Sequence, residues 1–190
     1  MPNFRVVVLA SGTGTLFTAL AKQADQIGIQ IVGLVTDAEV PACDRARELG
    51  IPVAIVPLLE DRIKWDQNLA TEISRLKPSL IVSAGFMKIL GPVVLRFYQG
   101  RIINTHPALL PNFPGAHAVR DALAAGVSET GSTIHFVDRG VDTGEVIAQA
   151  RVKVEPSDTE ESLHERIKEV ERELLVATVS DIAQGKVTLK

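Results

Sequence analysis

The first two thirds of the chain alternate short runs of apolar, mostly β-branched residues with stretches of helical spacing. Strands are predicted over residues 5–10, 30–36, 52–56, 80–83 and 102–105, and helices over 16–27, 44–49 and 65–76. The strand-like runs are continuous rather than alternating, which is typical of a parallel sheet covered by helices on both faces. Strand–helix repetition with right-handed crossovers therefore predicts an α/β fold, a doubly wound, mostly parallel sheet.

The pattern changes after residue 126. Apolar runs over 132–137 and 146–154 are separated by a short segment, which predicts an antiparallel strand pair in the C-terminal part of the sheet. A long helix is predicted to begin near Thr159, because Ser157 and Glu160 have the spacing of a capping box. The apolar side of this helix is predicted to contain Leu163, Ile167, Val170, Leu174 and Ile182.

Composition narrows the class of protein. The 190 residues contain no internal repeat or linker, so a single domain over residues 1–190 is expected. A net charge of −3 and 4% aromatic residues argue against a nucleic-acid surface, and no apolar run has the length of a membrane span. Cys43 is the only cysteine, so an internal disulfide is excluded and a buried thiol in a cytoplasmic protein is expected.

Residues 11–16 follow the first predicted strand and contain two glycines, Gly12 and Gly14. Such a turn exposes backbone N–H groups at a helix N-terminus, where a phosphate binds well. A dinucleotide fingerprint requires a third glycine at position 17, which is Phe17, although Asp37 imitates the acidic residue that contacts the ribose. A monophosphate site is favoured over a nicotinamide dinucleotide site or a purely structural turn.

Residues 104–115 (NTHPALLPNFPG) place three prolines directly after a predicted buried strand. Asn104 and His106 are two positions apart, so an extended chain directs both side chains to one face. Pro107 favours an extended conformation at His106, and the further prolines restrict the loop. The segment is interpreted as a preorganised site, with a structural histidine at the end of a strand as the alternative.

Other polar residues carry less information by themselves. The four histidines are widely separated and lack cysteine partners or helical i, i+4 spacing, which argues against a metal site. Asp142, in the segment 140–144 (GVDTG), is by its local sequence a turn aspartate.

Several motifs in order resemble the folate-dependent formyltransferases: NTHPALLP from Asn104, Gly115, GVDTG over 140–144, SAGFMKIL over 83–90 and HFV over 135–137. The resemblance extends from near residue 5 to near the C-terminus. It is strongest to members that formylate glycinamide ribonucleotide in purine biosynthesis. It implies a Rossmann-like formyltransferase fold whose N-terminal part binds the acceptor phosphate and whose C-terminal part binds folate and carries out catalysis.

The resemblance also implies the roles of individual residues. The formyl group of 10-formyltetrahydrofolate would pass to the amine of glycinamide ribonucleotide, without a metal. The implied catalytic residues are Asn104, His106 and Asp142. The implied acceptor contacts are Gly12, Thr13, Gly14, Thr15, Pro107 and Glu171. The implied folate contacts are Arg62, Met87, Lys88, Ile89, Leu90, Asn104, Gly140 and Val141. Small-molecule substrates are expected, with neither nucleic acid nor membrane, in a monomer or homodimer.

Two departures and several rival functions accompany the resemblance. Many relatives read Gly-x-Gly-Ser-Asn-Leu where this chain has residues 12–16 (GTGTL), a loop one residue shorter and without the asparagine, and many have an arginine where it has Lys88. Formylation of initiator tRNA is disfavoured because those relatives carry an additional C-terminal domain. Folate deformylases and sugar-nucleotide formyltransferases are generally longer. A non-catalytic nucleotide- or folate-binding protein and an NAD-dependent oxidoreductase are the alternatives from other classes.

Overall fold

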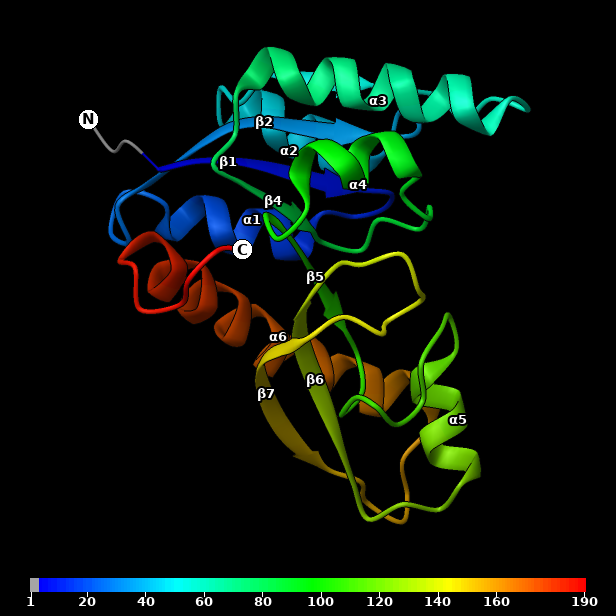
Figure 1. Ribbon diagram of the computed structural model, residues 1–190. Helices are drawn as coiled ribbons and strands as arrows, with labels where there is room; N and C mark the ends of the chain where they lie inside the picture. Colours follow the sequence, from blue (N-terminus) through cyan, green and yellow to red (C-terminus); the bar gives the residue numbers. More distant parts are fainter. Residues whose placement is uncertain (1–3) are drawn as a thin grey trace.

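A computed structural model describes residues 4–190, which form seven strands and six helices around one sheet (Figure 1). In chain order they are β1 (Phe4–Ala10), α1 (Thr15–Gln23), β2 (Ile29–Thr36), α2 (Pro41–Glu48), β3 (Val53–Ile55), α3 (Arg62–Leu76), β4 (Leu80–Ser83), α4 (Pro92–Tyr98), β5 (Ile102–His106), α5 (Ala118–Ala124), β6 (Glu129–Phe136), β7 (Val146–Lys153) and α6 (Glu160–Ala183).

The strand order in the sheet is β3-β2-β1-β4-β5-β6-β7. The first five strands pair in parallel, whereas β6 runs antiparallel to both β5 and β7. The predicted doubly wound sheet with an antiparallel C-terminal pair is therefore confirmed. Because β5 pairs with β4 on one side and β6 on the other, it lies where the parallel part of the sheet meets the antiparallel part.

Alternate residues of the central strand β1 enter two different cores. Val6 and Val8 pack with α1, α2 and α6, whereas Val7 and Leu9 pack with α3 and α4. Figure 1 shows these two groups of helices on opposite faces of the sheet. Both faces of the strand are thus apolar, which explains why its sequence is continuous rather than alternating. A smaller apolar cluster joins α5, α6 and β7 at the other end.

Some local predictions need correction. Helix α6 is capped by Thr159 and Ser162, which exchange side-chain and backbone hydrogen bonds, rather than by Ser157 and Glu160. Its buried side includes Glu171 and Leu175, which are outside the predicted apolar stripe, while the predicted Val170 and Leu174 are only partly buried. Helices α4 and α5 were not predicted, because each has only seven residues. Among residues 4–190, none of the helices combines the length and apolar character needed to cross a bilayer.

Candidate active site

Strand β5 directs Asn104 and His106 to the same face of the sheet, as their spacing predicted. In the antiparallel pair with β6, Asn104 lies opposite His135 and His106 lies opposite Thr133. The Asn104 Nδ2 atom is 3.3 Å from His135 Nε2. The register of the two strands thus brings together Asn104 and His135, which are 31 residues apart in the chain, and places a carboxamide beside two imidazoles.

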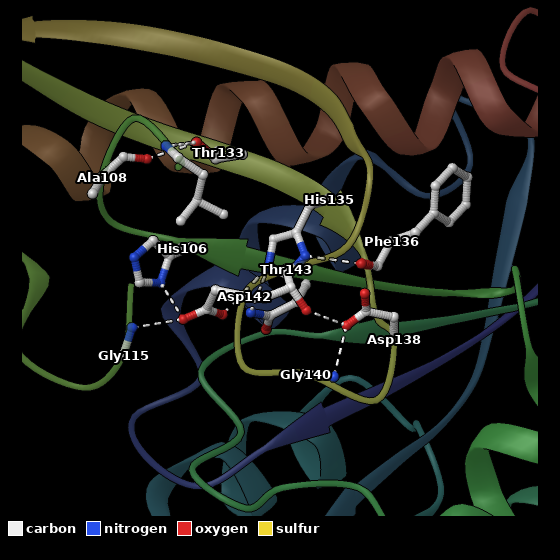
Figure 2. Close-up of polar contacts among 12 residues, drawn as sticks. His106, Ala108, Gly115, Thr133, His135, Phe136, Asp138, Gly140, Asp142 and Thr143 are labelled. Atoms are coloured by element: carbon white, nitrogen blue, oxygen red, sulfur yellow. Dashed lines mark hydrogen bonds and ion pairs between the residues drawn. The ribbon is translucent and has the colours of Figure 1, made fainter. Parts of the chain in front are cut away.

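Asp142 is brought to these side chains by the segment 137–145, which connects β6 to β7 and folds back over β5 (Figure 2). Its Oδ2 atom lies 3.3 Å from His106 Nδ1 and accepts a 2.8 Å hydrogen bond from the Gly115 backbone N–H. Its Oδ1 atom lies 3.5 Å from His135 Nε2. Asn104, His106 and Asp142, the trio implied by the resemblance, therefore form one cluster.

The turn that carries Asp142 is shaped by its own polar groups. Asp138 accepts hydrogen bonds from the Gly140 N–H at 2.9 Å and from the Thr143 hydroxyl at 2.7 Å. Asp142 itself has φ of 54°, a left-handed conformation that costs energy for a residue with a side chain. A Cβ atom at Gly144 would lie 1.6 Å from the Phe136 carbonyl oxygen, so only glycine fits there.

The proline-rich loop after β5 holds the cluster from the other side. The Phe113 carbonyl oxygen lies 2.8 Å from His106 Nε2, and the Gly115 N–H binds Asp142. The loop is fixed to β6 by Thr133, whose hydroxyl donates to the Ala108 carbonyl at 2.6 Å and accepts from the Leu110 N–H at 3.1 Å. The stiffness expected from the prolines therefore serves to position two backbone groups.

Both ring nitrogens of His106 face acceptors, the Asp142 carboxylate and the Phe113 carbonyl. A neutral imidazole carries one N–H and could satisfy only one of them, whereas an imidazolium donates to both. His106 is 4% exposed, so few alternative partners are available from solvent.

His135 is a member of the cluster to which sequence analysis gave no role. Its Nδ1 lies 2.9 Å from the Phe136 carbonyl, so Nδ1 carries a proton. Its Nε2 lies between the Asn104 amide and Asp142, so a neutral ring accepts from Asn104 and a charged ring donates to Asp142. The sequence signal was weak, because only the register of β6 against β5 places His135 opposite Asn104.

The carboxyl of Asp142 remains ionised. Hydrogen bonding to the His135 ring is the main cause, the Gly115 N–H and the charge of His106 add to it, and burial opposes it. Together they lower the pKa of Asp142 from 3.8 to about 2. The ionised carboxylate of Asp142 therefore faces both imidazole rings of the cluster.

The glycine loop after β1 has the geometry of an anion site. Gly14 has φ of 74° and its backbone lies against Ala42, where a Cβ atom would approach the Ala42 Cβ to 2.7 Å. Thr13 is exposed and Thr15 begins α1. Within the described residues, no side chain caps α1, so its first N–H groups are available to an anion.

The surroundings of Asp37 argue against the alternative of a nicotinamide dinucleotide site. Asp37 accepts a hydrogen bond from the Ser11 hydroxyl at 2.5 Å and an ion pair from Lys88 at 2.9 Å, so its carboxylate is engaged within the protein. Phe17 is fully buried in the core, where a glycine of the fingerprint would have allowed close approach of the helix.

The predicted folate residues lie at the edge formed by β4, α3 and α4. Met87 and Ile89 are 72% and 67% exposed, which is unusual for large apolar side chains, whereas Leu90 is buried. Arg62 donates a 2.8 Å hydrogen bond to the Ile89 carbonyl and stacks on Trp65. Lys88 does not point to free solvent but pairs with Asp37.

A cavity of about 530 Å³ lies between α4 and the start of the segment 137–145. It is lined by Pro92, Leu95, Arg96, Gln99, Val137, Asp138, Arg139 and Gly140. Its volume falls within the range of pockets that bind drug-sized molecules. Gly140, a predicted folate contact, lines this cavity, and the exposed Val141, a second one, lies between Gly140 and Asp142 in the chain.

Two predicted acceptor contacts differ in their surroundings. Pro107 directly follows His106 and is partly exposed. Glu171 is 5% exposed and receives a hydrogen bond from Ser132, which lies on the face of the sheet opposite Asn104 and His106. Burial raises the pKa of Glu171, while hydrogen bonds from Thr105 and Ser132 partly oppose the rise. Its role as an acceptor contact stays a prediction.

Among residues 4–190, no group of three or more histidine, cysteine, aspartate or glutamate side chains has an arrangement that could hold a metal ion. Cys43 is buried as expected, and its sulfur lies 3.5 Å from the Thr36 hydroxyl.

Residues 4–179 match the family model described as formyl transferase. The chain belongs to the formyl transferase family. It is 49% identical over 188 residues to the phosphoribosylglycinamide formyltransferase of Mycobacterium tuberculosis, covering 97% of this chain and 87% of that protein. The crystal structure of glycinamide ribonucleotide transformylase 1 from Symbiobacterium toebii superposes with a TM-score of 0.95 at 33% identity, covering 98% of this chain and 91% of the other.

A second solved structure agrees with the first. The phosphoribosylglycinamide formyltransferase of Bacillus halodurans superposes with a TM-score of 0.92 at 36% identity, covering 97% of this chain and 98% of that one. Family membership was therefore predicted correctly from the motifs, and the chain is an enzyme of the formyl transferase type.

Proposed function

We propose that this formyl transferase moves the formyl group of 10-formyltetrahydrofolate to the amine of glycinamide ribonucleotide, giving the N-formyl product and tetrahydrofolate. The observation that carries the proposal is the convergence of Asn104, His106 and Asp142, with 3.3 Å between His106 Nδ1 and Asp142 Oδ2. The names of the relatives specify the acceptor.

The chemistry requires two functions of the protein. Attack of the acceptor amine on the formyl carbon forms a C–N bond and leaves a tetrahedral intermediate with an oxyanion. The bond from that carbon to N10 of the folate then breaks, and a proton from the attacking amine must reach N10. The site therefore needs donors for the oxygen and a route for the proton.

Asn104 and His106 are the groups proposed to stabilise the oxyanion, the first as a hydrogen-bond donor and the second by its charge. Asn104 has a second amide N–H besides the one directed to His135, and His106 adds positive charge in its imidazolium form. One donor of this kind is worth about 10²–10³ in rate. Asp142 is the proposed group that favours the charged ring and passes the proton to N10, with or without an intervening water.

The two substrates would approach from neighbouring parts of the same sheet edge. The phosphate of the acceptor would bind the N–H groups of residues 12–15 at the start of α1. The folate would occupy the cavity beside Gly140 and the exposed apolar side chains of Met87 and Ile89. Holding both reactants beside the trio removes much of the entropic part of the barrier. No residue of the protein needs to form a covalent intermediate.

The decisive experiment offers the purified protein 10-formyltetrahydrofolate together with glycinamide ribonucleotide, initiator tRNA or water alone, and measures release of tetrahydrofolate. Release that depends on glycinamide ribonucleotide, with the formyl group recovered on that acceptor, is expected. The variant His106→Ala serves as the catalytic control. Equal release with water would indicate a deformylase, and formylation of the tRNA would give the protein a different acceptor.

A further inference from the structure

A chain of polar contacts connects the glycine loop to the segment that carries the predicted folate residues. Ser11, directly before Gly12, donates from its hydroxyl to Asp37 Oδ1 at 2.5 Å. The Ser11 Oγ atom also accepts a 3.0 Å hydrogen bond from the Met87 N–H. The other carboxylate oxygen of Asp37 pairs with Lys88 Nζ at 2.9 Å. We refer to Ser11, Asp37 and Lys88 as the relay.

Backbone contacts reinforce this connection. The Ser11 N–H donates to the Gly85 carbonyl at 3.1 Å, and the Ala42 N–H donates to the Gly12 carbonyl at 3.2 Å. The segment 84–90 is therefore attached to the residue that starts the glycine loop through both its backbone and its side chains. Three strand ends contribute, because Ser11 follows β1, Asp37 follows β2 and residue 84 follows β4.

The relay contains one ion pair, in which Asp37 and Lys88 neutralise each other's charge. The side chains of Asp37 and Lys88 are 13% and 25% exposed, so the pair is shielded more than an ordinary surface ion pair. Burial opposes ionisation of Asp37, but the Ser11 hydroxyl and Lys88 outweigh burial and lower the pKa of Asp37. If either partner were removed, the other would keep a partly buried charge without its counter-charge.

Other contacts of the segment 84–90 include apolar ones, because Ala84 and Leu90 are buried and Phe86 stacks against Trp65. Met87 and Ile89 are largely exposed. Near the C-terminal end of the segment, Arg62 donates a hydrogen bond to the Ile89 carbonyl, and Asp66 accepts one from the Gly91 N–H. Those two hydrogen bonds fix the end of the segment that leads into α4. The beginning of the segment, at Met87 and Lys88, is held by the relay.

We propose that Asp37 is a positioning residue that couples the two half-sites, so that ordering of the glycine loop by the acceptor phosphate orders the folate-binding segment through Ser11 and Lys88. The inference rests on the proposed function and assigns a role to three residues outside the catalytic trio. Because coupling between two sites is reciprocal, each substrate must strengthen binding of the other by the same factor.

The test measures the dissociation constant of tetrahydrofolate by calorimetry with and without saturating glycinamide ribonucleotide, and the reverse titration. We expect the wild-type protein to bind tetrahydrofolate at least about 5-fold more tightly when the acceptor is present, the lower end of usual coupling. In Asp37→Asn the factor should fall to below about 2-fold, and the KM for the folate should rise while kcat changes little.

Matched variants separate the relay from a general loss of structure. Lys88→Arg keeps the ion pair with Asp37 and should retain the coupling, whereas Lys88→Met should lose it. Glu39→Gln removes an exposed carboxylate of the same loop, one that pairs with Arg47, and should leave the factor unchanged. Ser11→Ala provides a second way to break the relay if Asp37→Asn does not fold.

The outcomes are distinct from those of the function test. A wild-type factor of 1, or an unchanged factor in both Asp37→Asn and Lys88→Met, would overturn the relay while leaving formyl transfer intact. A wild-type protein that releases no tetrahydrofolate with glycinamide ribonucleotide would instead reject the proposed function.

Discussion

The partly buried carboxylate of Asp142 and the buried one of Glu171 lie on opposite faces of β5 and β6, and their surroundings shift their pKa values in opposite directions. The Asp142 carboxylate contacts two imidazoles and a backbone N–H, and these contacts lower its pKa to about 2. Glu171 lies beneath the sheet, where burial raises its pKa and hydroxyl groups only partly oppose the rise. The difference shows that hydrogen-bond and charge partners outweigh burial at Asp142, whereas burial outweighs the hydroxyl partners at Glu171.

The contrast has a functional consequence. An ionised Asp142 can hold a charged His106 and accept a proton during the reaction, as proposed for catalysis. Glu171, with hydroxyl neighbours and little access to water, is better suited to a polar contact or a packing role. Four predictions would sharpen or break this comparison, beginning with the largest effect.

His106→Ala and Asp142→Ala should each lower kcat by at least about 10²-fold, because each removes a participant in charge stabilisation or proton transfer. Affinity for the acceptor, measured by calorimetry, should stay close to that of the wild-type protein. The exposed carboxylate of Glu48 offers a matched control, and Glu48→Ala should keep full turnover. A near-normal kcat in His106→Ala or Asp142→Ala would mean that the substituted residue does not take part in catalysis.

Asn104→Asp should lower kcat by about 10²–10³-fold, since it replaces an oxyanion donor with a negative charge. Circular dichroism and thermal unfolding should show an intact fold, because the two side chains have nearly the same shape. Steady-state kinetics at saturating folate provide the measurement. A fully active variant would contradict the assignment of Asn104 as a donor to the oxyanion.

Asp142→Asn should lower the free energy of unfolding by about 2 kcal/mol at neutral pH, the value of a shift from 3.8 to about 2. Because the folded pKa is the lower one, this stabilisation is present above about pH 4 and is lost as the pH falls through 2. Urea unfolding of both proteins between pH 2 and 7 measures it. A difference that does not shrink at low pH would mean that Asp142 is not held ionised.

Glu171→Gln should have the smallest effect and the opposite dependence on pH. The raised folded pKa favours the protonated acid, so the stability that it contributes is present below 4.5 and is lost as the pH rises through the folded value. Glutamine resembles the neutral acid, and the variant should therefore gain stability relative to the wild-type protein as the pH rises. Urea unfolding over the same pH range measures this difference in stability. A stability gain of the variant that grows toward low pH would contradict a raised pKa for Glu171.

Much of the fold could be predicted because strand and helix periods are local properties of the chain. Continuous apolar runs such as residues 5–10 indicated a sheet buried on both faces, and that sheet is present. The short helices α4 and α5 were missed, since seven residues give too few turns for a period to emerge. The cap of α6 was misplaced by two residues because Thr159 and Ser157 are both suitable capping residues.

By itself, the sequence determined the sheet, the family and the pairing of Asn104 with His106 on one face, because each depends on near neighbours in the chain or on ordered motifs. Only the tertiary structure decided that His135 joins them, that Asp37 binds Ser11 and Lys88, and that the pKa values of Asp142 and Glu171 shift in opposite directions. The physical reason is that strand register and the partners of a buried charge arise from residues far apart in the chain. Such contacts exist only once the chain has folded.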